Sequence, residues 1–157
     1  MHLERLNQNQ RFMEALRNFA STGKTIYAEC GGYMYLGQEI TDFAGRAYSM
    51  AGLIPIKSEM TKKLQGMGYR RGVFTADSFL GKAGMEVHGH EFHYSKVDFQ
   101  ENGDGEPASA YNLYKGEQLL RSDGYAKKNI FASYLHLNFA GHPQLMERWA
   151  EYIRQGA

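Results

Sequence analysis

The stretch Thr25-Ile-Tyr-Ala-Glu-Cys30-Gly-Gly-Tyr-Met-Tyr-Leu36 decides the fold of this chain. Ile26 and Ala28 alternate with more polar neighbours, the period of two that is typical of a short strand. Cys30 follows, and the two residues after it are glycines, which allow a sharp turn. The residues beyond them predict the first turns of a helix. A reactive side chain on a tight strand-to-helix turn is the layout of a nucleophile elbow.

A helix that begins at Gly31 would aim free N–H groups and the positive end of its dipole at the Cys30 thiol. Both effects favour a thiolate over a thiol. Gly31 and Gly32 also let a substrate approach the main chain closely, so we expect them to contribute to substrate binding. From these residues alone two interpretations stay open, a catalytic cysteine and a buried structural cysteine beside a glycine turn.

The bulk composition is that of an ordinary globular protein. The chain has 157 residues, of which 43% are hydrophobic and 22% charged, and its length suits one domain. The formal net charge of +1 provides no global field for nucleic acid or an anionic membrane, and we expect neither as a partner. The single cysteine cannot form an internal disulfide, and no apolar run is long enough to cross a bilayer. We therefore expect a cytoplasmic protein.

The remaining pattern predicts an α/β fold. An amphipathic helix over 6–20 ends near Gly23 and leads directly into the strand at 25–29, which we place in a parallel sheet. Strands separated by glycine and charged turns follow, including one over 48–56 and a hairpin turn at 122–124, and they predict antiparallel additions. Pro143 suits the first turn of a final helix whose buried stripe is predicted to be Leu145, Met146, Trp149 and Ile153.

A cysteine nucleophile needs a base to take its proton. His136 is the preferred candidate, because it lies near the end of a strand predicted over 129–139, just before a glycine turn. His88 and His90 have the His-x-His spacing of zinc ligands and would share one face of a strand, with Glu91 and His93 on the other. No further cluster of ligands completes such a site, so we expect no metal.

Three motifs carry a resemblance to a known family. Tyr27-Ala-Glu-Cys-Gly-Gly-Tyr-Met-Tyr-Leu36, Gly89-His-Glu-Phe-His-Tyr-Ser95 and Ser133-Tyr-Leu-His-Leu-Asn-Phe139 occur in the order seen in cobyrinic acid a,c-diamide synthases. The chain resembles the C-terminal glutamine amidotransferase domain of that family over essentially its whole length. This resemblance favours the catalytic interpretation of Cys30.

The resemblance implies a class I, triad-type glutamine amidotransferase fold with a flavodoxin-like core. Such a domain hydrolyses glutamine to glutamate and ammonia. Cys30 matches the nucleophile that forms a γ-glutamyl thioester, and His136 matches its base. Many class I relatives carry a glutamate two residues after that histidine, where this chain has Asn138. The resemblance therefore implies a Cys–His dyad, in which Asn138 could orient the imidazole by a hydrogen bond. For Gly89–Ser95 it implies no catalytic role, and pocket shaping and strand packing stay open.

The rest of the family's enzyme is not in these residues. The Gly-x-x-x-x-Gly-Lys-Ser/Thr phosphate loop does not occur, so ATP and Mg²⁺ are expected in an absent synthetase domain and no cofactor is expected here. The match begins at the helix before the elbow strand, which implies that 1–157 is one partial amidotransferase domain. An earlier glycine-rich loop would then be missing, and loss of one oxyanion donor typically costs on the order of a hundredfold or more in rate.

The expected function is the glutaminase part of a cobyrinic acid a,c-diamide synthase, which supplies ammonia to the a and c carboxylates of a tetrapyrrole in cobalamin biosynthesis. Amidation of cobyric acid or a nickel tetrapyrrole is a close variant. A catalytically idle interaction module is the alternative from another class, because an uncovered strand edge favours self-association or pairing with the missing N-terminal portion. A cysteine hydrolase without a link to glutamine is a third possibility.

Overall fold

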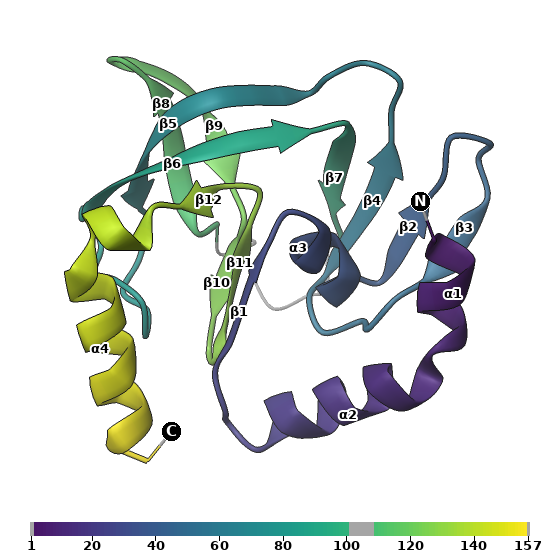
Figure 1. The fold of residues 1–157 in the computed structure, drawn as a ribbon, viewed down its shortest axis with the longest axis horizontal. Helices are drawn as coiled ribbons and strands as arrows, with labels where there is room; N and C mark the ends of the chain where they lie inside the picture. Colours follow the sequence, from purple (N-terminus) through teal and green to yellow (C-terminus); the bar gives the residue numbers. More distant parts are fainter. Residues whose placement is uncertain (1, 101–108, 157) are drawn as a thin grey trace.

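The computed structural model describes residues 2–100 and 109–156. Its helical segments are α1 (Leu3–Gln8), α2 (Gln10–Ser21), α3 (Gly31–Leu36), the 3-10 turn η1 (Phe139–Gly141) and α4 (Pro143–Arg154). Its strands are β1 (Ile26–Glu29), β2 (Glu39–Thr41), β3 (Ala47–Ser49), β4 (Ile56–Met60), β5 (Gly66–Phe74), β6 (Glu86–His93), β7 (Ser95–Phe99), β8 (Tyr111–Lys115), β9 (Gln118–Asp123), β10 (Tyr125–Lys127), β11 (Ile130–Ser133) and β12 (His136–Leu137). Figure 1 shows α2 below the sheets and α4 at one side of them.

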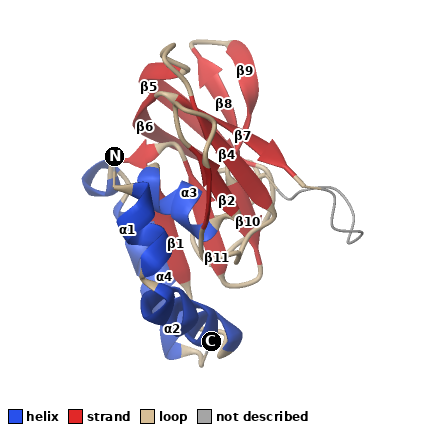
Figure 2. Cartoon of the chain, turned by 90° about the vertical axis from the view of Figure 1, so that its right-hand side faces the viewer, coloured by secondary structure: helices blue, strands red, loops and turns tan. Residues whose placement is uncertain are grey.

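In the described parts of the chain the strands form three sheets. Their strand orders are β1-β11-β10, β12-β6-β5-β8-β9 and β3-β2-β4-β7. The pairs β1–β11 and β2–β4 are parallel, and every other pairing is antiparallel. The α/β class, with parallel pairs and antiparallel additions, is therefore confirmed. Figure 2 shows α3 among the strands, with α1, α2 and α4 outside them.

The sheet β1-β11-β10 separates two hydrophobic clusters, because alternate residues of its strands point to opposite faces. Ile26, Ala28 and Ala132 contact the first cluster, whereas Tyr27 and Phe131 contact the second. α3 packs between this sheet and β4 in the first cluster (Figure 1). The elbow strand is therefore held from both faces.

The predicted N-terminal helix is interrupted. Asn9 separates α1 from α2, and its side-chain Oδ1 accepts a hydrogen bond from the Phe12 backbone N–H at 3.3 Å as an N-cap of α2. Gly23 has a φ of +81° after the end of α2, as its predicted capping role requires. The prediction of a helix in this region is thus confirmed, but the prediction of one continuous helix over 6–20 was wrong.

The strand predicted over 129–139 is two strands in different sheets. β11 ends at Ser133, and β12 begins at His136 against β6. At the crossing, the Tyr134 backbone N–H donates to Asp123 Oδ2 at 3.0 Å, and the Leu135 N–H donates to Ser133 Oγ at 3.2 Å. These side chains satisfy the backbone groups that leave the ladder, so the chain can change sheets inside the core.

The turn predicted as a hairpin at 122–124 is also a change of sheet. β9 pairs with β8, whereas β10 pairs with β11. Gly124 has a φ of +76°, and a Cβ there would lie 2.5 Å from the Ala132 carbonyl oxygen. A glycine at this position is therefore required by the close crossing and not by a hairpin.

The strand predicted over 48–56 is largely a loop. Met50, Ala51 and Ile54 are buried in it, but their backbone groups bond to the end of α3 instead of a neighbouring strand. The Leu53 and Ile54 N–H groups both donate to the Leu36 carbonyl, at 2.8 and 3.1 Å. An apolar run that caps a helix looks like a strand in sequence.

The final helix begins at Pro143 as predicted, but its apolar stripe is buried only in part. Leu145 is buried, and Trp149 packs against the second cluster and donates from Nε1 to Thr25 Oγ1 at 2.7 Å. Met146 and Ile153 are 46% and 54% exposed, so the prediction that they are buried was wrong. No helix in residues 2–100 and 109–156 is long and apolar enough to span a membrane.

Candidate active site

Cys30 occupies a strained backbone position between β1 and α3. Its φ of 50° and ψ of −107° lie in a region that residues with a side chain rarely adopt. The Cys30 N–H donates to the Ser133 carbonyl at 2.8 Å, and the Cys30 carbonyl accepts from the Met34 N–H at 3.1 Å. The turn is thus fixed by the parallel strand on one side and by the helix on the other. This is the backbone of a nucleophile elbow.

The surroundings of the thiol favour its protonated form. Burial raises the pKa of Cys30, the backbone N–H of Gly31 lowers it, and the negative charge of Glu29 raises it further, with a net result above the ordinary value. The Gly31 N–H at the helix start thus acts on the pKa of Cys30 in the predicted direction, but burial and Glu29 outweigh it. α3 has only six residues, and its one aimed N–H does not offset the loss of solvent. A nucleophile in this state needs a base.

The two glycines after Cys30 lie in different environments. A Cβ on Gly31 would meet nothing within 4 Å, whereas one on Gly32 would lie 3.3 Å from the Ala28 Cβ. Gly31 therefore borders open space beside the thiol, and Gly32 packs against the elbow strand. A role in substrate contact stays a prediction, and the geometry favours Gly31 for it.

His136 lies at the start of β12, opposite His90 in the register of β6. Its imidazole is 45% exposed. The next residue, Leu137, pairs with Gly89. The pairing of β12 with β6 thus places the predicted base at an exposed edge of the five-stranded sheet (Figure 1).

A carboxylate from the elbow strand joins the two predicted catalytic residues. Glu29 directly precedes Cys30, and its Oε2 lies 3.0 Å from His136 Nδ1. Its other oxygen, Oε1, accepts from the Leu137 backbone N–H at 2.8 Å and from the Tyr27 hydroxyl at 2.5 Å. The sequence analysis did not single out Glu29. Its available signal was an acidic residue on the same strand face as Tyr27, one position before the nucleophile.

Within the described residues, the Asn138 side chain makes no hydrogen bond to the His136 ring. Its Oδ1 accepts from the Gly141 backbone N–H at 3.3 Å and caps η1. Its own N–H donates to the His88 carbonyl at 3.2 Å. The orienting hydrogen bond that was predicted for Asn138 is made by Glu29 instead. Asn138 lies beyond the end of β12 and its side chain caps the following turn, whereas β1 brings Glu29 to the ring from another sheet.

Most other histidines have structural contacts. The ring of His142 stacks on that of His88 at 5.8 Å between centroids, and its Nε2 accepts from the His88 backbone N–H at 2.9 Å. Burial and the neighbouring His88 lower the pKa of His142. His93 is buried on the face of β6 that also carries Glu91, as the alternation predicted. Among the described residues, no three His, Cys, Asp or Glu side chains form a group that could hold a metal ion.

The Gly89–Ser95 segment supports both predicted catalytic residues. Its Gly89 pairs with β12, and the Phe92 carbonyl oxygen lies 4.0 Å from Cys30 Sγ. Ser95 Oγ lies 2.7 Å from the Tyr134 hydroxyl, close to the point where the chain leaves β11. The segment thus acts as packing and also forms part of the wall beside the thiol.

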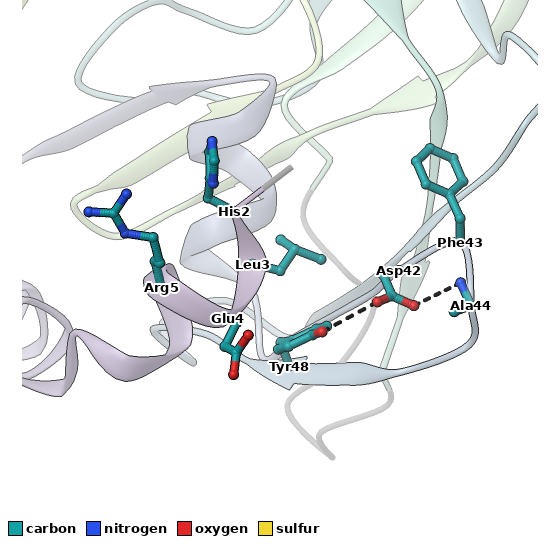
Figure 3. Close-up of a pocket in the computed structure, with 8 residues that line it drawn as sticks. All are labelled: His2, Leu3, Glu4, Arg5, Asp42, Phe43, Ala44 and Tyr48. Atoms are coloured by element: carbon teal, nitrogen blue, oxygen red, sulfur yellow. Dashed lines mark hydrogen bonds between the residues drawn. The ribbon is translucent and has the colours of Figure 1, made fainter.

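Two cavities lie outside this constellation. One of about 460 Å³ lies between α1 and the turn from β2 to β3 (Figure 3), where Asp42 Oδ1 already accepts from the Ala44 N–H at 2.8 Å. The other, of about 380 Å³, is lined by Tyr33, His93 and Tyr134, among others. Neither Cys30 nor His136 is among the residues that line them.

Comparison with known proteins identifies the family of the chain. The model of the CobB/CobQ-like glutamine amidotransferase domain matches residues 1–144. A cobyrinate a,c-diamide synthase of Caldanaerobacter subterraneus subsp. tengcongensis is 35% identical over 148 residues, which cover 94% of this chain and 32% of that protein. The enzyme of that name from Salmonella typhimurium is 37% identical over 96% of this chain and 32% of its own length.

A similarity in fold extends to a solved structure. The crystal structure of a glutamine amidotransferase from Thermotoga maritima superposes with a TM-score of 0.57 at 10% identity, over 98% of this chain and 57% of that one. At this identity the match concerns the fold alone. The chain spans about one third (32%) of the length of these two curated relatives. By the family match over residues 1–144, the chain belongs to the CobB/CobQ-like glutamine amidotransferase domain family.

Proposed function

We propose that this chain is the glutaminase part of a cobyrinate a,c-diamide synthase. In this proposal Cys30 is the nucleophile, His136 is the base, and glutamine is the substrate. The observation that carries it is the strained elbow: the lone cysteine has a φ of 50°, and the residue before it holds His136 through a 3.0 Å hydrogen bond. A strained backbone conformation is costly and persists only where the surrounding structure fixes it, and such positions cluster at active sites.

The first half-reaction transfers the γ-glutamyl group to sulfur. His136 Nε2 takes the proton of the Cys30 thiol while the sulfur attacks the side-chain amide carbon of glutamine. The developing oxyanion accepts a hydrogen bond from the Gly31 backbone N–H, the residue after the nucleophile. The imidazolium then gives its proton to the departing nitrogen. The C–N bond breaks, ammonia leaves, and a thioester remains on Cys30.

The second half-reaction regenerates the thiol. His136 Nε2 accepts a proton from water as the water oxygen attacks the thioester carbonyl. The C–S bond breaks, the sulfur recovers the proton from the imidazolium, and glutamate is released. The sum is glutamine plus water giving glutamate plus ammonia. Because the pKa of Cys30 is raised, base assistance is essential in the first half-reaction.

We propose cobyrinic acid as the acceptor for ammonia because the relatives are named cobyrinate a,c-diamide synthases. The part of those proteins outside this match would bind the tetrapyrrole and, with ATP and Mg²⁺, activate its a and c carboxylates. Cobyric acid and a nickel tetrapyrrole are alternative acceptors. Assaying the full-length protein with each tetrapyrrole, glutamine and ATP distinguishes the three, and amidation of cobyrinic acid is the expected result.

The glutaminase step is tested by covalent labelling with 6-diazo-5-oxo-L-norleucine, a glutamine analogue that alkylates the nucleophile. Because the chain has one cysteine, mass spectrometry of the intact chain and of its peptides assigns the adduct without ambiguity. We expect one adduct on Cys30, protection by glutamine, and no adduct on the Cys30→Ser variant. Absence of an adduct, also with the remainder of the full-length protein present, would contradict the proposal.

A second candidate function, an idle interaction module, is favoured by one observation. β1 is at the end of its sheet in the described residues, since it pairs with β11 on one side only. The exposed backbone edge of a strand is a template for pairing with another chain. Size-exclusion chromatography with light scattering separates the candidates: a monomer that turns over glutamine excludes the idle module, and an unlabelled dimer supports it.

A further inference from the structure

We propose that Glu29 is the positioning residue for His136, and that it holds the imidazole in the tautomer that can accept the thiol proton. The inference rests on the proposed function, because it assigns His136 the role of base. It differs from the dyad expected from the sequence, since it gives the base a carboxylate from the position before the nucleophile. The juxtaposition that carries it is one carboxylate bonded to His136, Leu137 and Tyr27.

The carboxylate has little freedom to move. Leu137 N–H and the Tyr27 hydroxyl hold Oε1 at 2.8 and 2.5 Å, which leaves Oε2 directed at His136 Nδ1. The Glu29 side chain is 24% exposed, about half the exposure of the imidazole. Because Leu137 follows His136 in the chain, Glu29 fixes the backbone of β12 and the ring with one group.

The ring of Tyr27 is itself anchored. It packs against Phe131, Phe139 and Trp149, with ring centroids 6.2, 5.3 and 5.7 Å away. Burial, then the neighbouring Tyr111 and Glu29, raise the pKa of Tyr27 far above its usual value, so its hydroxyl remains a donor. The aromatic cluster therefore fixes the hydroxyl that fixes Glu29.

The consequence for His136 follows from the inventory of donors and acceptors. A carboxylate accepts only, so a neutral imidazole beside it carries its proton on Nδ1 and keeps the lone pair on Nε2. No hydrogen bond from the described residues occupies Nε2. The free lone pair is the one that the proposed first half-reaction uses. A carboxylate behind a histidine also stabilises the imidazolium that forms when the thiol proton moves.

Glu29 affects the two catalytic residues in different ways. Its charge adds to the raised pKa of Cys30, which is the next residue, and its Oε2 holds the His136 ring at Nδ1. A raised thiol pKa disfavours a thiolate before glutamine is bound. During attack, a carboxylate behind a histidine stabilises the imidazolium that receives the proton. The same carboxylate thus suppresses idle thiolate reactivity and assists the directed reaction.

The test compares the Glu29→Gln variant with the parent chain by two measurements. The first is ¹⁵N NMR of the histidine-labelled chain, with His136 assigned through His136→Gln. In the parent we expect the neutral ring to be protonated on Nδ1. In Glu29→Gln the amide oxygen can satisfy Tyr27 and Leu137 while its NH₂ faces Nδ1, so we expect the proton to move to Nε2. An unchanged tautomer would overturn the inference.

The second measurement is the rate of labelling by 6-diazo-5-oxo-L-norleucine, separated into binding and maximal rate. We expect Glu29→Gln to lower the maximal rate on the order of a hundredfold with little change in half-saturation. Glu29→Asp retains the charge and should recover part of the rate. Glu59→Gln, an exposed glutamate on β4, is the matched control and should label as the parent does. A parent-like rate in Glu29→Gln would overturn the inference.

Two safeguards keep the outcomes distinct. Thermal unfolding followed by circular dichroism identifies a variant that has lost its fold, and Tyr27→Phe then provides a second test. Tyr27→Phe keeps the carboxylate, so we expect the Nδ1 tautomer to persist and the rate to fall less than in Glu29→Gln; the Nε2 tautomer in Tyr27→Phe would overturn the inference. If the parent itself is not labelled, the proposed glutaminase fails, while the NMR result still decides the role of Glu29.

Discussion

The backbone of Gly89 lies so close to His136 that a Cβ on this glycine would be 2.3 Å from the His136 carbonyl oxygen. No side chain fits at that distance, so the contact between β6 and β12 depends on a glycine. The strand that carries the proposed base is only two residues long, and it pairs with β6 at His90 and Gly89. The position of His136 is thus determined partly by a residue on the opposite strand.

We therefore expect Gly89→Ala to displace β12 and to slow labelling of Cys30 by the glutamine analogue. Overpacking of this kind costs about 1–3 kcal/mol of unfolding free energy, measurable by urea unfolding. Gly72→Ala in β5 is the control, because its Cβ would meet only side-chain atoms, at 3.1 Å or more. It should retain the labelling rate. Equal labelling by Gly89→Ala and the parent would contradict the role given to this contact.

We expect Glu29→Gln to have opposite effects on the alkylation of Cys30 by iodoacetamide and on its labelling by the glutamine analogue. Burial raises the pKa of Cys30, and the charge of Glu29 adds to that increase. Thiolate formation in the parent should therefore begin at higher pH than for an ordinary cysteine, as followed by iodoacetamide alkylation. Glu29→Gln removes the neighbouring charge, so its alkylation profile should shift to lower pH.

Alkylation by iodoacetamide at fixed pH thus becomes faster in Glu29→Gln, while labelling by the glutamine analogue becomes slower. A general loss of structure would expose the thiol and accelerate both reactions, or it would abolish labelling by the glutamine analogue without changing the rate of alkylation by iodoacetamide. Parallel changes in the two rates would contradict the account of Glu29 as a charge that acts on both residues.

Asn138 offers a direct comparison between two candidate partners of His136. Its side chain caps η1 through the Gly141 N–H. Asn138→Ala should cost about 1 kcal/mol of stability, as loss of a cap typically does, and should leave the tautomer of His136 unchanged. A shift of that tautomer in Asn138→Ala, seen by the same ¹⁵N NMR measurement, would return the orienting role to Asn138.

The contrast between Glu29 and Asn138 shows which parts of the site can be predicted from the sequence. The elbow is local: alternating apolar residues, one cysteine and two glycines within eight positions predict its strand, its turn and its helix. The partner of His136 is not local, because it depends on how β1 and β12 meet from different sheets. A sequence pattern places residues along one element, and only the packing of elements selects which carboxylate reaches the ring.

The same limit explains the errors in the fold. Ser133 to His136 looks like one continuous strand, since nothing in these letters marks the crossing that Asp123 stabilises through the Tyr134 N–H. Alternation on β6 predicted correctly which residues share a face, because that strand pairs with β5 in one register from Glu86 to His93. Regular elements were therefore predictable, and transitions between sheets were not.

The buried carboxylate of Glu91 predicts how this fold responds to acid. It is 1% exposed, and it joins three strands of one sheet through Arg70 at 2.7 Å and Arg121 at 2.5 Å. Burial raises the pKa of Glu91, but His93, Arg121 and Arg70 outweigh it and lower the pKa to about 2. A carboxyl with a depressed pKa in the folded state contributes stability above its ordinary pKa, and that stability is lost as the pH falls toward the folded value.

The free energy of unfolding of the parent should therefore fall steeply from about pH 4.5 to about pH 2, the interval between the ordinary and the folded pKa of Glu91. Glu91→Gln removes the carboxylate that pairs with Arg70 and leaves Arg121 with the longer contact to Asp123 Oδ1 at 3.4 Å, so it should be less stable at neutral pH by about 3 kcal/mol. Its stability should also depend less on pH in that interval, as measured by urea unfolding at each pH. Glu59→Gln should keep the slope of the parent, because Glu59 is exposed. A parent-like slope in Glu91→Gln would mean that other carboxylates cause the loss, since Glu91 is then not the group that takes up the proton.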